Sequence, residues 1–285
     1  MSQRRLLGIF AHPDDESFGS GGMLAYYAHS GVEVHVCTLT DGAAGSIDPG
    51  FLEQAGAGTL ADARRGELAC ACRALGVAQL HLLDYRDSGM EGSADNKHPA
   101  SLYQADVDEV AARIMHLISE VRPQVVVTHD PTGGYFHPDH IKTHHAVARA
   151  WSQLSEPGSW PAGCTAWQPD RLYYGVIPRS QLRWLLFLLR LTGRDPKRFG
   201  QNHDIDLTSV GVDDRNIQVR LNVGAYLSYK EHASACHRSQ GGGAARHFPN
   251  FLAQRAQRYE HFVQAYPSNG RRHIDLFEGL DGSAA

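Results

Sequence analysis

The sequence lacks the features that mark a secreted, membrane-embedded or nucleic-acid-binding protein. Its 285 residues carry a formal net charge of -4, so no overall positive charge attracts nucleic acid or an anionic membrane. The first apolar run, LLGIF, reaches a charged cluster too early for a signal peptide. The longest later run, residues 184–189, is far shorter than the roughly 20 residues of a membrane helix. We therefore expect a cytoplasmic protein without a nucleic-acid or membrane partner.

Cysteine is also scarce and scattered. The number of cysteines is odd and none forms a CxxC pair, which argues against a disulfide framework and against a structural zinc knuckle. We expect reduced, mostly buried thiols at all five positions, namely Cys37, Cys70, Cys72, Cys164 and Cys236.

The pattern of hydrophobic residues indicates an α/β fold. Residues with hydrophobic side chains make up 42% of the chain, enough for a large core. The first half alternates short strand-like runs with longer runs of helical periodicity. The expected strands are 6–11, 33–40, 79–84 and 124–128, and the expected helices are 17–29, 60–75, 105–121 and 139–154. Such alternation predicts a Rossmann-like, mostly parallel sheet flanked by helices, with right-handed crossovers.

The regular alternation fades after Trp151. We assign residues 1–160 to a Rossmann-like catalytic part, and residues 161–285 to a smaller α+β part that completes the substrate pocket within one integrated domain. In the C-terminal part we expect a strand at 172–177, a buried helix at 182–191, and helices at 226–237 and 251–266. The apolar helix is alternatively a contact in a homo-oligomer. The loop 239–246 is either an active-site lid or an ordinary surface loop.

Two short His-Pro-Asp clusters provide the strongest functional signal. HPDDE, residues 12–16, follows the first expected strand, and HPDH, residues 137–140, follows the fourth. In a parallel sheet, ligands bind beyond the carboxyl ends of the strands, so the two clusters can meet there. His12, Asp15 and His140 then offer two imidazoles and a carboxylate, which suits a catalytic zinc site with an open position for water. The same donors suit ferrous iron.

Two further side chains of these clusters are candidates for the chemistry. Asp14 stands beside the ligand set as a base for the water, and His137 as a donor to an oxyanion. With 17 histidines, chance clusters are more frequent than usual, and aspartates before helices also serve as caps. Two HPD units at strand-to-helix turns are hard to explain by capping alone. We therefore favour the metal site.

A metal pair on one helix face and a nucleotide site are the rival hypotheses. His140 and His144 are four residues apart, but no acidic general base lies between them. The GSGG cluster at 19–22 does not have the GxGxxG spacing, and the acidic residues at 14–16 would repel a pyrophosphate. A nucleotide-binding Rossmann module therefore ranks below a metal-dependent hydrolase.

At these motifs the sequence resembles the LmbE-like deacetylases, which include the N-acetylglucosaminyl-phosphatidylinositol de-N-acetylases. The AHPDDE and HPDH segments look like the two signature motifs of that family. The segments that look closest to the bacterial thiol-sugar branch, the mycothiol and bacillithiol deacetylases, are Arg64-x-x-Glu67-Leu68, LGV at 75–77, RDSGM at 86–90 and GGYFHPDH at 133–140. The similarity covers the first half of the chain well, and the rest chiefly at CHRSQ, residues 236–240.

The resemblance implies a role for each residue of these motifs. The implied roles are zinc ligation by His12, Asp15 and His140, base catalysis by Asp14, oxyanion stabilisation and acid catalysis by His137 with its ring oriented by Asp139, and substrate binding by Arg64, Asp87, Met90 and a mobile Tyr135. One departure is Phe136, where glycine is common in the thiol-sugar branch.

The leading functional hypothesis is a zinc-dependent N-deacetylase. It hydrolyses the acetamide of a small N-acetylglucosaminyl conjugate to acetate and a free amine, in the biosynthesis of a low-molecular-weight thiol such as bacillithiol or mycothiol. The alternative is an amidase that cleaves a larger amide, such as a thiol-sugar S-conjugate, with the same chemistry. Assays of both amides side by side distinguish the two.

Overall fold

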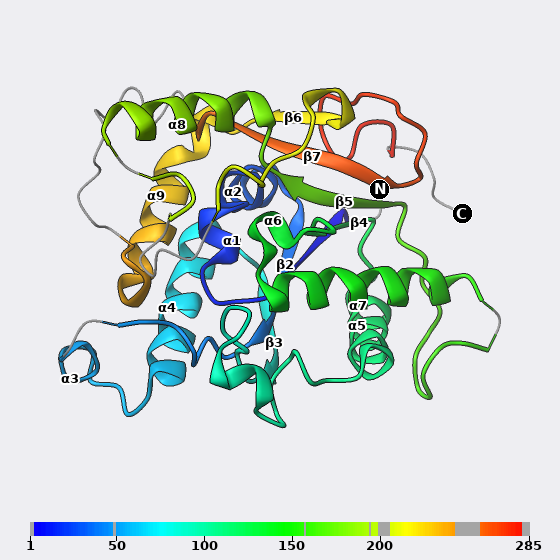
Figure 1. Ribbon diagram of the computed structural model, residues 1–285. Helices are drawn as coiled ribbons and strands as arrows, with labels where there is room; N and C mark the ends of the chain where they lie inside the picture. The colour runs from blue at the N-terminus through cyan, green and yellow to red at the C-terminus, as the bar shows by residue number, and fades with distance from the viewer. Residues whose placement is uncertain are drawn as a thin grey trace.

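In the computed structural model, a seven-stranded sheet runs through the molecule (Figure 1). The structure describes residues 3–47, 50–156, 158–193, 195–198, 206–242 and 257–280. The order of the strands across the sheet is β3-β2-β1-β4-β5-β7-β6. In chain order they are β1 (Arg5–Phe10), β2 (Glu33–Thr40), β3 (Gln79–Tyr85), β4 (Val125–His129), β5 (Arg171–Val176), β6 (Val219–Asn222) and β7 (Tyr259–Tyr266).

The first five strands are parallel and place β1 in the interior of the sheet. Leu6 of β1 pairs with Val34 of β2 on one side and with Val125 of β4 on the other. Strand β7 runs antiparallel to both β5 and β6. The predicted fold class is therefore confirmed as a mostly parallel α/β sheet flanked by helices. The carboxyl ends of β1, β2, β3 and β4 face the same edge, which is where the HPD clusters follow.

Helices cover both faces of the sheet (Figure 1). The α-helices of the described residues are α1 (Asp15–Phe18), α2 (Gly21–His29), α3 (Phe51–Ala55), α4 (Leu60–Leu75), α5 (Val107–Val121), α6 (Gly133–Phe136), α7 (Pro138–Leu154), α8 (Arg179–Leu191) and α9 (Leu227–Cys236). Neighbouring residues of β1 point to opposite faces of the sheet. Leu6 packs in the cluster with α2, α4 and α9, whereas Leu7 packs in the cluster with α5 and α7.

Helix α5 illustrates how local sequence sets these elements. Asp106 caps its N-terminus, because the carboxylate accepts hydrogen bonds from the backbone N–H groups of Asp108 and Glu109. Val110 and Ile114, at helical spacing, are fully buried against the sheet. The helix therefore begins where the capping residue places it and docks through one apolar face.

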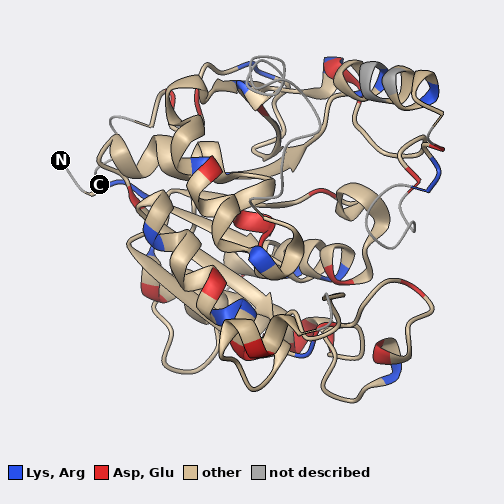
Figure 2. Ribbon diagram, turned by 90° about the vertical axis from the view of Figure 1, so that its left-hand side faces the viewer, with Lys and Arg blue, Asp and Glu red and all other residues tan. Residues whose placement is uncertain are grey.

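The distribution of charged residues and the lengths of the apolar helices agree with what the composition of the sequence predicts. Figure 2 shows Lys and Arg interspersed with Asp and Glu along the helices on the side of the molecule that faces the viewer. Among the described residues, no helix is long and apolar enough to cross a membrane. The predicted apolar helix is present as α8, but it is only partly buried, since Phe187 is 52% and Leu191 67% exposed.

The predicted helix at 251–266 is wrong over the part that the structure describes. Residues 259–266 form strand β7, inserted between β5 and β6. The helical spacing of apolar residues in YEHFVQAY is short, and the backbone of this segment instead pairs with β5 on one side and β6 on the other. Phe262, for example, pairs with Gly175 of β5 and Val219 of β6. Residues 251–256 lie outside the described residues, as do residues 243–246 of the loop that was considered as a lid.

Two smaller expectations also need correction. The predicted helix 17–29 is two helices, α1 and α2, which are separated at Gly19 and Ser20. The prediction of five reduced thiols is wrong, since Cys70 of α4 forms a disulfide with Cys236 at the end of α9. The packing of α9 on α4 brings together two cysteines that are 166 residues apart in the chain. Sequence spacing gives no sign of this pairing.

Candidate metal centre and active site

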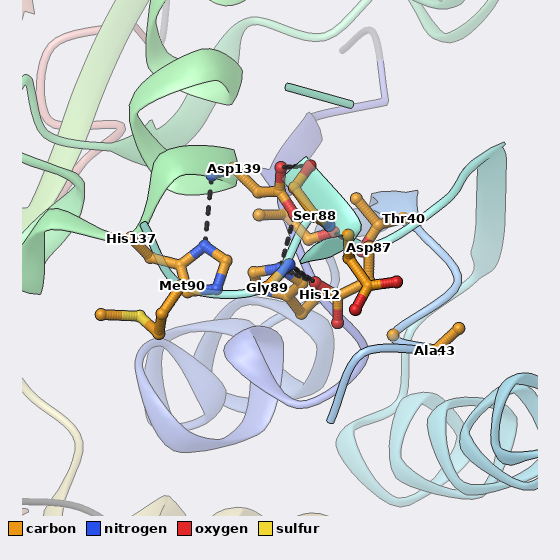
Figure 3. Close-up of polar contacts among 12 residues, drawn as sticks. His12, Thr40, Ala43, Asp87, Ser88, Gly89, Met90, His137 and Asp139 are labelled. Carbon is orange, nitrogen blue, oxygen red and sulfur yellow. Dashed lines mark hydrogen bonds and ion pairs between the residues drawn. The ribbon is translucent and has the colours of Figure 1, made fainter. Parts of the chain in front are cut away.

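The two HPD clusters meet at the carboxyl edge of the sheet. His12 follows β1, and His140 lies in the first turn of α7, shortly after β4. Both side chains are buried, and His12 Nδ1 lies 3.1 Å from His140 Nε2. Figure 3 shows His12, Asp87 and Asp139 converging on the same region from three different segments. The structure therefore brings together residues that are more than a hundred positions apart in the sequence.

The donor atoms of His12, Asp15 and His140 are spaced as a small metal ion requires. The carboxylate of Asp15 lies 3.7 Å from His12 Nδ1 and 3.3 Å from His140 Nε2. Ligands of a tetrahedral ion with bonds near 2.0–2.1 Å are about 3.3 Å apart. The three distances between these side chains, 3.1–3.7 Å, fit this geometry. The set could hold zinc, and its oxygen and nitrogen donors also suit ferrous iron.

Neighbouring groups fix the tautomers of the two imidazoles. His12 donates from Nε2 to the Asp139 carboxylate at 3.1 Å, which leaves the lone pair of Nδ1 directed at the donor set. His140 donates from Nδ1 to the carbonyl of Gly133 at 3.0 Å, which leaves the lone pair of Nε2 free. Such partners orient metal-binding histidines and make them better ligands.

The position of Asp139 differs from the expectation that it orients His137. Its carboxylate accepts hydrogen bonds from His12, from the backbone N–H of Ser88 and from the Ser88 hydroxyl. Only the backbone N–H of Asp139 reaches His137, where it donates to Nδ1 at 3.2 Å (Figure 3). Asp139 thus orients His12, because α7 begins at Pro138 and turns its first carboxylate toward β1.

His129 is part of the site but was not predicted from the sequence. Its ring stacks on that of His140, with centroids 4.0 Å apart, and its Nε2 accepts the backbone N–H of Ala11. Burial and the nearby charge of His140 lower the pKa of His129 to about 4. Since its lone pair already has a partner, we regard His129 as a support for His140. Its place at the carboxyl end of β4 is the signal that could have indicated it.

Several overlapping combinations of side chains have donor atoms within 4.8 Å of one another. Among the described residues these are His12 with His137 and His140, Asp15 with His129 and His140, and His12 with Asp87 and Asp139. His12 Nδ1 and His140 Nε2 face each other at 3.1 Å, and both lie within 3.7 Å of the Asp15 carboxylate. This favours the set of His12, Asp15 and His140.

The adjacent carboxyl groups of Asp14 and Asp15 have opposite pKa shifts. Burial raises the pKa of Asp14 to about 6, although the guanidinium of Arg64 lies 3.1 Å away and opposes this shift. Burial also favours a raised pKa for Asp15, but the charge of His140 holds it well below its usual range. This difference between the two pKa values suits one carboxylate that accepts a proton and a second that stays ionised.

His137 is a buried hydrogen-bond donor beside the donor set. Its ring packs edge-on against His12, with centroids 4.4 Å apart. Burial and the charges of His12 and His140 lower the pKa of His137 to about 2. Because Nδ1 accepts the Asp139 N–H, the hydrogen of the neutral ring is on Nε2. His137 can therefore donate one hydrogen bond, and its low pKa does not favour the implied role as an acid.

The predicted sugar-binding residues lie on the side of the site that faces β2 and β3. Arg64 binds the carbonyls of Gly42 and Pro13 and lies 3.9 Å from the carboxylate of Asp87. The charge of His12 and a hydrogen bond from it hold the pKa of Asp87 well below its usual range, although burial opposes this. Met90 projects beside His137 (Figure 3). These side chains therefore adjoin the metal centre, each with contacts of its own to the protein.

A cavity of about 550 Å³ opens on the other side of the centre. Asp14, Asp15, Tyr135 and His140 line its inner end, whereas Arg64 and Asp87 are not among its lining residues. The ring of Tyr135 lies 4.9 Å from that of His140. The C-terminal part supplies much of the outer wall, including Gln181, Lys230, Gln257, Tyr259, Glu260 and His261.

The backbone around Tyr135 and Phe136 is irregular. Gly134 and Phe136 have φ of 74° and 68°, and Phe136 is 43% exposed. A positive φ favours glycine over a bulky residue. Phe136 thus occupies a position at which glycine would be less strained.

Comparisons with known proteins show which family the chain belongs to. Residues 7–151 match the family described as PIG-L: GlcNAc-PI de-N-acetylase. A 1D-myo-inositol 2-acetamido-2-deoxy-alpha-D-glucopyranoside deacetylase of Thermobifida fusca is 37% identical over 98% of both chains.

Two solved structures share the fold. The N,N'-diacetylchitobiose deacetylase from Pyrococcus horikoshii has a TM-score of 0.60 at 20% identity and covers 92% of this chain and 84% of its own. GalB, the 4-carboxy-2-hydroxymuconate hydratase from Pseudomonas putida, has a TM-score of 0.58 at 20% identity and covers 96% of this chain and 100% of its own. Since one is a deacetylase and the other a hydratase, these likenesses establish the fold alone. The sequence matches go further: the chain belongs to the GlcNAc-PI de-N-acetylase family and is an enzyme of the deacetylase type.

Proposed function

We propose that the protein is a metal-dependent N-deacetylase that hydrolyses the acetamide of an N-acetylglucosaminyl conjugate to acetate and a free amine. The observation that carries the proposal is the meeting of the two HPD clusters. It places the donors of His12, Asp15 and His140 within 3.1–3.7 Å of one another, beside a partly buried base and a buried hydrogen-bond donor.

The reaction follows from the positions of these side chains. His12, Asp15 and His140 would hold zinc or ferrous iron, which supplies polarisation of the amide carbonyl and a more acidic water. Asp14 accepts a proton from the water that attacks the carbonyl carbon. His137 donates from Nε2 to the oxygen that becomes negative. The proton on Asp14 then passes to the nitrogen as the C–N bond breaks, which yields the amine and acetate.

We assign the sugar to the side of the centre formed by Arg64, Asp87 and Met90, with Tyr135 at the inner end of the adjoining cavity. The guanidinium of Arg64 is a cationic donor group that lies 3.1 Å from Asp14 and 3.9 Å from Asp87. The carboxylate of Asp87 provides an ionised acceptor. A pyranose, whose hydroxyls both donate and accept, matches this pair.

We assign the aglycone to the cavity on the C-terminal side. Its wall carries polar groups, among them the buried ion pair of Lys230 and Glu260 at 2.6 Å. The similarity to a deacetylase of a myo-inositol glucosaminide over nearly the whole chain supports a hydroxylated aglycone of that kind. The motifs that resemble the thiol-sugar branch, such as RDSGM and GGYFHPDH, support a place in thiol-sugar biosynthesis. An amidase for a larger amide would use the same centre, so the assays compare both substrates.

Metal analysis of variants tests the ligand set. His12→Ala and His140→Ala should lose most of the bound metal and the activity, since each removes one of three ligands. His144→Ala is the matched control, because His144 lies one turn further along α7 and hydrogen-bonds the carbonyl of His129. If the ligand variants bind as much metal as the parent, the assignment is wrong.

Acetate release tests the substrate class. We expect turnover of N-acetylglucosaminides with a polyol aglycone, and slower turnover of simple acetamides. Preferential cleavage of a thiol-sugar S-conjugate amide would favour the amidase. Absence of any acetate release from the metal-loaded enzyme over the whole panel would contradict the proposed function.

A further inference from the structure

The C-terminal segment CHRSQ, residues 236–240, lies outside residues 7–151, over which the family model matches, and has no role in the chemistry described so far. The structure places it across α1 and α4. Cys236 is disulfide-bonded to Cys70, and Ser239 donates from its backbone N–H and its hydroxyl to the carboxylate of Glu67. The segment is therefore held to α4 at two points, one on each side of His237.

Between these two points, His237 reaches the first HPD cluster. Its Nε2 donates to Glu16 Oε1 at 2.7 Å, and both side chains are completely buried. The other ring nitrogen, Nδ1, has no hydrogen-bond partner among the described residues. A buried polar atom without a partner costs folding free energy, so the fold tolerates a cost to keep this histidine here.

Glu16 in turn holds the backbone of Asp14. Its Oε2 accepts the N–H of Asp14 at 2.9 Å, and its Oε1 accepts the hydroxyl of Ser17 as well as His237. Asp14 has φ 135° and ψ -26°, a conformation that residues other than glycine rarely adopt. Such a conformation persists only where surrounding contacts determine it.

The arrangement leaves Glu16 and His237 no direct access to a substrate. Both oxygens of Glu16 have protein partners, and the side chain is 0% exposed. The carboxylate of Asp14, in contrast, lines the cavity. Glu16 therefore contacts the base through one hydrogen bond, which it accepts from the backbone N–H of Asp14.

We propose that Glu16 and His237 are positioning residues, which hold the Asp14 peptide in its unusual conformation and so aim its carboxylate at the reacting water. The C-terminal segment thereby completes the active site of the N-terminal part. The inference rests on the proposed function in one respect, namely the role of Asp14 as the base.

Two variants of His237 separate positioning from packing. His237→Leu removes the donor to Glu16 and keeps a buried side chain of moderate size. We expect kcat to fall about 10- to 100-fold, because small misplacements of a reacting group cost up to about 10²-fold. KM and metal content should stay close to those of the parent. His237→Gln keeps a donor near the place of Nε2 and should restore most of the lost kcat.

His35→Leu is the matched control for the loss of a buried histidine. His35 is 5% exposed and donates to the carboxylate of Glu33 at 3.1 Å, at the opposite end of β2 from the metal centre. It should lower the melting temperature without changing kcat. If His237→Leu behaves in the same way, or if His237→Gln gives no recovery, the positioning role is refuted.

A double-mutant cycle tests whether the effect passes through Asp14. In an Asp14→Asn background, His237→Leu should cause little further loss, because the base that it positions is already absent. If Asp14→Asn keeps only its residual rate and His237→Leu lowers that rate by its full factor, the inference fails and the proposed function stands. If Asp14→Asn alone retains parental activity, the proposed role of the base fails first.

Discussion

Replacement of Asp14 by asparagine is the sharpest test of the reaction that we propose. Asparagine has the same shape, and its carbonyl oxygen can still accept the hydrogen bond that Arg64 donates at 3.1 Å. The three donors assigned to the metal belong to other residues. The variant should therefore fold, bind metal as the parent does, and lack only a group that can accept a proton.

The expected loss follows from the surroundings of the carboxylate. Burial raises the pKa of Asp14 to about 6, close to neutral pH, where a base both remains ionised and accepts protons readily. Removal of a general base of this kind typically costs about 10²- to 10⁴-fold in rate. At about 1.36 kcal/mol for each factor of ten, this is roughly 3–5 kcal/mol of transition-state stabilisation. We expect the loss in kcat, with KM little changed.

The assay is acetate release together with metal analysis of the same preparation. Asp15→Asn is the matched comparison, because it makes the same carboxylate-to-amide change at the neighbouring residue. In this case the change removes a proposed metal ligand, whose carboxylate lies 3.3 Å from His140 Nε2. Asp14→Asn should be metal-replete and slow, whereas Asp15→Asn should be metal-poor. Metal loss in Asp14→Asn with retention in Asp15→Asn would exchange the two roles and refute our reasoning.

Four other outcomes are expected. His137→Ala should keep its metal and lose about 2.7–4 kcal/mol of transition-state stabilisation, measured as kcat/KM, because an oxyanion donor is removed; unchanged kcat/KM would contradict this role. Asp87→Ala should lower kcat/KM for an N-acetylglucosaminide about tenfold or more while sparing a simple acetamide, and an equal loss on both substrates would assign Asp87 to the metal centre or the fold. Cys70→Ser opens a loop of 166 residues and should lower the free energy of unfolding, measured with urea, by as much as about 5 kcal/mol in the chain-entropy limit. If the parent protein unfolds at the same urea concentration with and without dithiothreitol, the disulfide contributes nothing to stability. Chelation should abolish activity, and addition of Zn²⁺ or Fe²⁺ should restore it, whereas activity that survives complete metal removal would exclude the metal-dependent reaction.

The sequence by itself determined the class of the fold and most of the first-half elements. Strands β2 and β3 and helices α4, α5 and α7 appear close to the expected residues, because periodicity and capping are local properties that neighbouring residues carry. The meeting of His12 with His140 was also predictable, since a parallel sheet brings the carboxyl ends of its strands to one edge. Both HPD motifs follow strands of this sheet, so they lie at the edge where ligands bind.

Only the tertiary structure decided the rest. Strand β7 forms because β5 and β6 offer it two edges, which no local window of the sequence contains. The pairs Cys70 with Cys236 and Glu16 with His237 join residues that are 166 and 221 positions apart, and depend on how α9 packs against α4 and α1. Even within the HPDH motif, the direction of α7 relative to the sheet decides that the Asp139 carboxylate contacts His12 and not His137. Local sequence fixes which groups are available, and packing selects which of them share a buried site.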